Sequence, residues 1–177
     1  PGVEAWNHFL ARGHPVDPAF VEARVATCTP ADPGVLLFSS GSTGKPKGIL
    51  SSHRAVSIQL WRLSRIFDVR EGDRVLTLNG FFWSGQFAMA IGGALGAGAT
   101  LVMQSFFEPE ATLALYEREK ITIPFGWPHQ WQQLGGAANI DKVDLSSLRN
   151  IGENNPLRNH PTVKTEWCEP TRIYGNT

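Results

Sequence analysis

The sequence predicts an α/β domain in which helices flank a layered, mostly parallel β-sheet. Short apolar runs typical of strands alternate along the chain with stretches of helical periodicity. Strands separated by helices of this length are joined by crossovers, and such connections favour parallel pairing. Hydrophobic residues make up 42% of the 177 positions and charged residues 18%, which suits one domain with a substantial core.

Residues 1–33 are expected to form a helical lead-in of two short helices. Asp17 followed by Pro18 is a helix start, because the carboxylate caps free N–H groups and proline fits the first turn. After the loop at 30–34, the apolar run at 35–38 predicts a buried strand. Residues 48–52 form a short extended piece.

Helices and strands are then expected to alternate. Apolar residues at spacings of four, three and four predict a helix from His53 with one buried stripe; they are Val56, Leu60, Leu63 and Phe67. Strands are expected at 74–78, 99–103 and 121–125, where Pro124 marks the end or edge of its strand. A buried apolar helix separates the first two strands. The helix from Glu108 to Lys120 separates the last two, with Ala111, Leu115 and Tyr116 facing inward.

The uncharged stretch 81–107 leaves a membrane span as an alternative, since Gly92 and Gly96 form a GxxxG pair. Several glycines and two glutamines interrupt the run, however, and no cluster of Lys or Arg flanks it. The sequence therefore favours a buried helix, a glycine turn and a buried strand, without a transmembrane segment.

Charge and cysteine content exclude several classes of protein. Lys plus Arg equals Asp plus Glu at 16 each, so no basic excess favours nucleic acid. Cys28 and Cys168 form neither a disulfide framework nor a zinc motif, which favours a reducing, cytoplasmic location. No metal-ligand spacing relates His8, His14 and His160, and we interpret His129 as a structural residue.

Residues 39–48, called here the phosphate loop, have the chemistry of an anion-binding segment. Glycines let the backbone approach a bulky anion, hydroxyls and backbone N–H groups donate hydrogen bonds, and two lysines supply charge. These residues are Ser39, Ser40, Gly41, Ser42, Thr43, Gly44, Lys45, Lys47 and Gly48. The loop is not a Walker motif, because Pro46 follows Gly44 and Lys45, and it has no dinucleotide fingerprint. A flexible surface linker is the alternative interpretation.

The segment 36–49 resembles the signature of the adenylate-forming superfamily, which includes acyl-coenzyme A synthetases, luciferases and peptide-synthetase adenylation domains. His53 also fits this pattern. The second matching segment, 174–177, is similar to the family's Tyr-Gly-x-Thr-Glu motif without the final acid. The resemblance covers the entire chain and is strongest toward acyl-coenzyme A synthetases.

The resemblance implies a role for each matching residue. The phosphate loop would clasp the β- and γ-phosphates of ATP, with Ser39 contributing to the magnesium environment. Tyr174 would stack on adenine, and Thr177 would contact the α-phosphate or the acyl-adenylate; Lys47 and Thr177 are the expected catalytic residues. The remaining nucleotide contacts implied are Gly152, Gly175 and Asn176. Segment 151–157 takes the place of a Gly-Gly-Ala-Pro motif, from which Glu153 and Asn154 depart.

A pocket for the acyl group is expected from aromatic segments that follow two strands. Residues 81–85 replace a His-containing segment of many relatives, and 125–128 form an aromatic corner. The candidate pocket residues are Trp83, Gly85, Phe125, Gly126 and Trp127. Aromatic linings suit an apolar acyl or aryl group, although core packing explains the same residues.

The resemblance implies ATP-dependent activation of a fatty or other apolar carboxylic acid to an acyl-adenylate, followed by transfer to coenzyme A. An adenylation domain of a peptide synthetase and a non-catalytic nucleotide-binding module are the alternatives. The acid after Thr177 and the catalytic lysine of the family's C-terminal domain are absent. Residues 1–177 are therefore interpreted as part of the large N-terminal ATP/AMP-binding domain, inactive in isolation.

Overall fold

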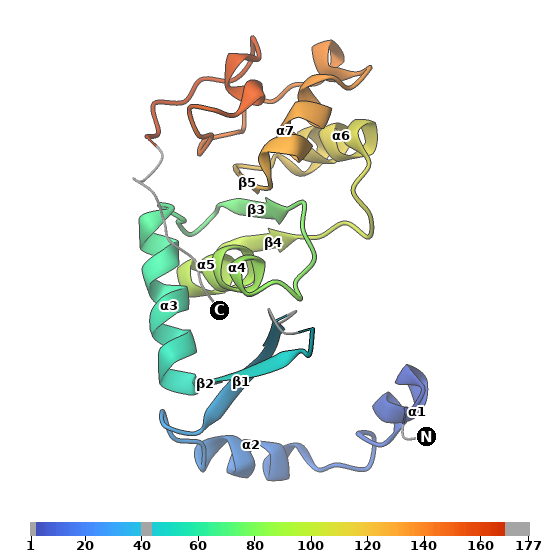
Figure 1. Ribbon diagram of the computed structural model, residues 1–177, viewed down its shortest axis with the longest axis vertical. Helices are drawn as coiled ribbons and strands as arrows, with labels where there is room; N and C mark the ends of the chain where they lie inside the picture. Colours follow the sequence, from blue (N-terminus) through green and yellow to red (C-terminus); the bar gives the residue numbers. More distant parts are fainter. Residues whose placement is uncertain (1–2, 40–43, 169–177) are drawn as a thin grey trace.

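The computed structural model describes residues 3–39 and 44–168, and the chain runs through helices and strands in the predicted alternation (Figure 1). The helices are α1 Trp6–Ala11, α2 Pro18–Ala26, α3 His53–Ile66, α4 Ser84–Gln86, α5 Gly93–Ala97, α6 Pro109–Glu119 and α7 Pro128–Gly135, with helical turns η1 Phe87–Gly92, η2 Ile140–Lys142 and η3 Pro156–Asn159. The strands are β1 Pro33–Ser39, β2 Lys47–Ser52, β3 Arg74–Thr77, β4 Thr100–Val102 and β5 Ile123–Phe125.

The predicted parallel sheet is present, and in the described part of the chain it holds three strands. Their order is β4-β3-β5, and β3 pairs in parallel with both neighbours. Because side chains alternate between the faces of a strand, neighbours in β3 enter different layers. Val75 packs with Leu63 and Phe67 of the α3 side, whereas Leu76 packs with the α6 and α7 side. The α/β fold class is confirmed, with helices covering both faces of the sheet (Figure 1).

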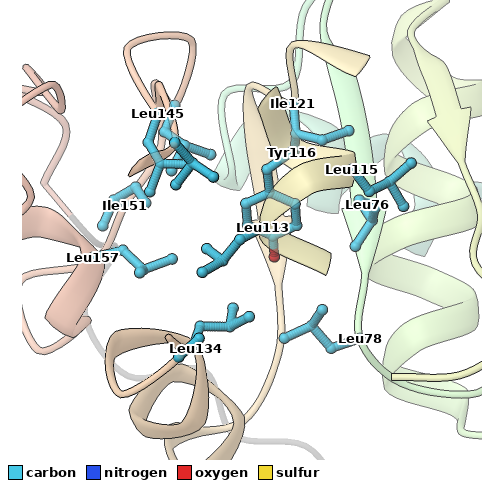
Figure 2. Packing of buried hydrophobic residues seen from close by; sticks show 13 residues of the cluster. Leu76, Leu78, Leu113, Leu115, Tyr116, Ile121, Leu134, Leu145, Ile151 and Leu157 are labelled. Atoms are coloured by element: carbon cyan, nitrogen blue, oxygen red, sulfur yellow. The ribbon is translucent and has the colours of Figure 1, made fainter. Parts of the chain in front are cut away.

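The larger hydrophobic cluster lies between the sheet and the helices α6 and α7. Figure 2 shows Leu76 and Leu78 of the sheet region facing the ring of Tyr116, with Leu113 and Leu134 beside it. Residues of the irregular stretch 143–157 close the far side of this cluster. The layer therefore ties the C-terminal described residues to the centre of the sheet.

Two short helices, α1 and α2, lie before the first strand, and the predicted start signal at Asp17 is confirmed. The Asp17 carboxylate accepts a hydrogen bond from the Ala19 N–H at 2.8 Å, with Pro18 in the first turn. In α3 the predicted stripe is also confirmed, because Leu63 and Phe67 are buried and Val56 and Leu60 half-buried. Neither α1 nor α2 has a buried residue.

The expectation of a buried strand at 35–38 was wrong. Strand β1 pairs antiparallel with β2 in a separate hairpin, with Leu36 opposite Leu50 and Phe38 opposite Gly48. The link at 40–46 is too short for a parallel crossover, which needs about a dozen residues or more, so the chain turns back. One face of the hairpin contacts α3. On the other face the Leu36 and Phe38 residues are 54% and 70% exposed.

Two further expectations need correction. Strand β4 is only half-buried at Leu101 and Val102, because it lies at the edge of the described sheet and pairs with β3 alone. Ala111 is exposed, since it stands in the first turn of α6 where Glu108 caps its N–H group from the solvent side. Leu115 and Tyr116 are buried as expected. Of the helices in the described ranges, none has the length and apolarity needed to cross a membrane.

Candidate functional site

The carboxyl ends of the three parallel strands meet at one edge of the sheet. Open α/β sheets bind ligands at this edge, because the loops that leave the strands open there. Gln130 of α7 joins two of these loops: its Oε1 accepts from the Trp127 N–H at 2.8 Å, and its Nε2 donates to the Leu78 carbonyl at 3.1 Å. The end of β3 is fixed further by Thr77, whose hydroxyl donates to the buried Gln86 side chain at 2.6 Å.

A depression of about 150 Å³ opens at this edge, between the loops that follow β3 and β4. Its lining residues are Thr77, Leu78, Asn79, Gly80, Phe81, Met103, Gln104, Ser105, Phe106 and Phe107. None of these carries a charge, and aromatic rings make up much of the wall. The sequence singled out the residues after β3, but it missed the contribution of the β4 loop.

The five predicted pocket residues occupy different surroundings. Trp83 and Trp127 are 59% and 51% exposed, both on segments that leave the carboxyl edge. Phe125 is instead buried against Phe67, with ring centroids 5.1 Å apart in an edge-to-face arrangement, so its side chain belongs to the core.

The two predicted glycines also differ in their surroundings. A Cβ at Gly126 would lie 2.8 Å from Leu78 Cδ1, which explains why glycine stands where this loop crosses the β3 loop. At Gly85, no atom of the residues that the structure describes lies within 4 Å of an added Cβ. Gly126 and Trp127 therefore lie near the loop that follows β3, whereas the side chain of Phe125 lies in the core.

The phosphate loop connects the two strands of the hairpin. Ser39 ends β1 and pairs with Lys47 of β2, so the described residues place both at the tip of a two-stranded ribbon. Gly44 has a φ of 78°, a conformation that favours glycine, and no atom of the described residues lies within 4 Å of a Cβ built there. Lys45 and Lys47 are exposed, and neither joins an ion pair among the described residues. Ser40, Gly41, Ser42 and Thr43 lie outside the described residues.

The segment 151–157 forms a turn followed by η3. Asn155 is buried, and its side chain accepts from the Leu157 N–H at 3.0 Å. Gly152 is half-buried, and the two departures from the expected motif, Glu153 and Asn154, are exposed. The predicted nucleotide contacts Tyr174, Gly175, Asn176 and Thr177 lie outside the described residues.

The opposite, amino-terminal edge of the sheet holds a charged network that the sequence did not predict. Arg149 donates to both carboxylate oxygens of Asp73 and to Asp68. The hydrogen bond from Arg70, together with Arg149, holds the pKa of Asp68 below its usual range despite partial burial. Arg149 and Asn150 also donate backbone N–H groups to the Thr122 carbonyl. The network therefore fixes the start of the segment that leads to Gly152.

The described residues form an α/β protein with exposed lysines at a hairpin tip and an uncharged depression at the carboxyl edge of its parallel sheet. The family model described as AMP-binding enzyme matches residues 4–177, and the chain belongs to this family. A methyl-dioxo-octahydroindenyl-propanoyl:CoA ligase of Mycobacterium tuberculosis is 35% identical over 81% of this chain and 28% of its own length. Indoleacetate–CoA ligase of Aromatoleum aromaticum is 34% identical over 84% of this chain and 30% of its own length.

A solved structure supports the same fold. The luciferase-like enzyme of the nonluminescent Zophobas morio mealworm superposes with a TM-score of 0.59 at 28% identity, covering 77% of this chain and 34% of that one. The chain spans about 30% of the length of the curated relatives described above. The activities of the complete relatives are therefore only proposed for this protein.

Proposed function

We propose that the protein carrying this chain is an ATP-dependent acid–thiol ligase that joins a ring-bearing carboxylic acid to coenzyme A. A carboxylate oxygen attacks the α-phosphorus of ATP, and pyrophosphate leaves; a thiol then attacks the acyl-adenylate carbon, and AMP leaves. The observation that carries the proposal is the AMP-binding family match over residues 4–177. Both curated relatives described above are named as coenzyme A ligases of acids that contain rings.

The hairpin tip supplies the phosphate-binding part of the proposed site. Lys45 and Lys47 are exposed and unpaired among the described residues, so both ammonium groups are available to a polyphosphate. Gly44 has no side chain and a positive φ, so its backbone N–H can be approached closely by a bulky anion. Bound ATP supplies the activated phosphorus and the leaving group. Positioning and charge stabilisation by the loop are the expected contributions of this chain. The roles assigned to Ser39 through Thr43, Gly152 and 174–177 stay predictions.

The carboxyl edge of the sheet supplies the acid-binding part. Trp83 and Trp127 expose aromatic surface there, and the uncharged depression lies between the β3 and β4 loops. Aromatic and apolar walls suit the body of a ring-bearing acid, whereas the charged carboxylate needs donors from elsewhere. This arrangement separates recognition of the acyl group from the chemistry at its carboxylate.

The described residues do not by themselves form a site for the magnesium that the family resemblance implies. They contain no group of three or more His, Cys, Asp or Glu side chains that could hold a metal ion. Ser39 is the predicted magnesium contact, and Mg²⁺ at nucleotide sites usually takes most of its oxygen ligands from phosphates and water. We therefore derive no step through magnesium from these residues.

The test is carboxylate-dependent exchange of pyrophosphate into ATP by the full-length protein, measured with a panel of aryl, alicyclic and fatty acids. We expect exchange with ring-bearing acids and a loss of about a hundredfold or more in Lys47→Ala, since a cation at the phosphates is removed. Lys142→Ala, which removes an exposed lysine on η2, is the matched control and should keep wild-type exchange. No exchange with any acid, while ATP still binds, would instead favour the nucleotide-binding module.

A further inference from the structure

The hydrogen-bond ladder between β3 and β5 ends where the chain turns toward Trp127. Thr77 and Phe125 are the last pair of residues in register, and the Leu78 N–H still donates to the Phe125 carbonyl at 2.8 Å. Gly126 then leads the chain out of the strand, and Trp127 is 51% exposed. Among the described residues, no backbone group pairs with the Leu78 carbonyl or the Trp127 N–H.

The side-chain amide of Gln130 provides both missing partners. Its Nε2 donates to the Leu78 carbonyl at 3.1 Å, and its Oε1 accepts from the Trp127 N–H at 2.8 Å. A glutamine side chain ends in the same C=O and N–H groups as a peptide unit, so it extends the ladder by one step. Gln130 is buried, which protects both hydrogen bonds from competition by water.

The corner that Gln130 holds is also restrained by its own sequence. A Cβ added at Gly126 would lie 3.1 Å from Trp131 Cζ2, so the backbone packs closely on the first turn of α7. Pro128 favours extended backbone in the residue before it, and Trp127 has a φ of −102° and a ψ of 156°. The inner side of Trp127 is therefore fixed, while its indole ring stays half-exposed at the carboxyl edge of the sheet.

We infer that Gln130 is a positioning residue that holds Trp127 as a wall of the acid-binding part of the site. The inference rests on the proposed ligase function and adds a residue that sets selectivity for the acid through the backbone of its neighbour. Without the amide, the Leu78 carbonyl and the Trp127 N–H lose their partners, and unpaired backbone groups move toward water. The indole ring then loses its fixed orientation toward the apolar body of the acid.

The first test measures pyrophosphate exchange by the full-length protein with 3-phenylpropanoate as the acid. We expect Gln130→Leu to raise the KM for this acid about tenfold, with kcat and the KM for ATP within about twofold of wild type, because recognition of the acyl body alone is disturbed. Leu134→Ala, a buried residue of the same helix, is the matched control, because it lowers stability but should leave the KM for the acid unchanged. Equal KM changes in the two variants would overturn the positioning role.

A double-mutant cycle determines whether Gln130 acts through Trp127. Trp127→Ala removes the ring, so adding Gln130→Leu to it should change the KM for the acid by less than about twofold. Gln133→Leu, an exposed glutamine of α7, should have no effect in either background. Full tenfold effects of Gln130→Leu in both backgrounds would contradict the inference while leaving the ligase function intact. Absence of exchange with every acid would instead overturn the ligase function.

Amide hydrogen exchange provides a measurement that does not depend on activity. In Gln130→Leu the Trp127 N–H should exchange about tenfold faster or more, since it has lost its acceptor, as read by mass spectrometry of overlapping peptides. The Leu78 N–H, which donates to the Phe125 carbonyl, should keep its wild-type rate. Unchanged exchange at Trp127, or equal acceleration at both amides, would overturn the positioning role whether or not the protein ligates acids.

Discussion

The guanidinium of Arg149 and the carboxylate of Asp73 form a two-point contact between segments 76 positions apart. The Asp73 side chain is 7% exposed and that of Arg149 30%. Thr122 donates its hydroxyl to the same carboxylate at 2.8 Å. This cluster joins the starts of β3 and β5 to the segment that continues toward Gly152.

Breaking this pair should destabilise the protein strongly. Arg149→Met leaves the Asp73 carboxylate buried without its main partner, and we expect the free energy of unfolding to fall by about 3 kcal/mol. Urea denaturation measures the change. Arg118→Met, which removes an exposed arginine paired with Glu119, is the control and should change stability by less than about 1 kcal/mol. Equal effects of the two variants would show that burial of the Asp73 pair has no energetic consequence.

Gly92 should tolerate no side chain, because the helix that contains it packs directly on α3. A Cβ there would overlap the Leu60 side chain, lying 2.8 Å from Cγ and closer to a methyl carbon. We expect Gly92→Ala to lower the unfolding free energy by about 1–3 kcal/mol through overpacking. Gly85→Ala is the control, because no described atom lies near the added methyl group. Its melting temperature should equal that of the wild type or be slightly higher. Adding Leu60→Ala to Gly92→Ala should recover part of the loss, and additive losses would contradict this packing.

The hydroxyl of Tyr116 should be dispensable for stability. The side chain is fully buried in the cluster of Figure 2, and its oxygen has no hydrogen-bond partner among the described residues. Burial raises the pKa of this phenol far above its usual value, so it stays neutral. Tyr116→Phe keeps the ring and removes an unpaired polar atom, and we expect a gain of about 1 kcal/mol in unfolding free energy. Leu113→Ala in the same cluster should lower the free energy of unfolding by about 2–5 kcal/mol. A loss in Tyr116→Phe would reveal a partner for the hydroxyl.

Stability should fall in acid through carboxylates that bind cations or N–H groups. The pKa of Asp68 is lowered by hydrogen bonds from Arg70 and Arg149, and that of Asp144 by bonds from Ser146 and Lys120. Both lie below the ordinary Asp value of 3.8. A carboxylate whose pKa is lower in the folded state than in the unfolded state stabilises the fold at pH values above its unfolded-state pKa. This stabilisation is lost as the pH falls through the folded-state pKa. The melting temperature should therefore drop below about pH 4.

The Asp68 contribution can be isolated with one variant. Asp68→Asn removes the titrating group, so its melting temperature should be lower than wild type at pH 7 and fall less steeply toward pH 3. Because the Asp68 side chain is 39% exposed, added salt should reduce the difference between the two proteins. Parallel pH profiles for the two proteins would exclude Asp68 as a contributor.

The local features of this protein could be predicted from its sequence. Helix starts such as Asp17, the buried stripe ending at Leu63 and Phe67, and the residue types of the phosphate loop depend on neighbours close along the chain. The family motifs are likewise recognised from residues that follow one another in the sequence. These signals predicted the parallel sheet and the position of Gly126 and Trp127 after its last strand.

Contacts between residues far apart in the sequence become visible in the folded structure alone. Apolarity predicted that 35–38 would be buried, whereas the short link to β2 made an antiparallel hairpin with Phe38 exposed. The pairing of Asp73 with Arg149 and the shared depression of Asn79 and Gln104 have no signal in periodicity, because side chains far apart in sequence meet only when the strands align. Periodicity reports which face of an element is apolar, and packing decides what covers it.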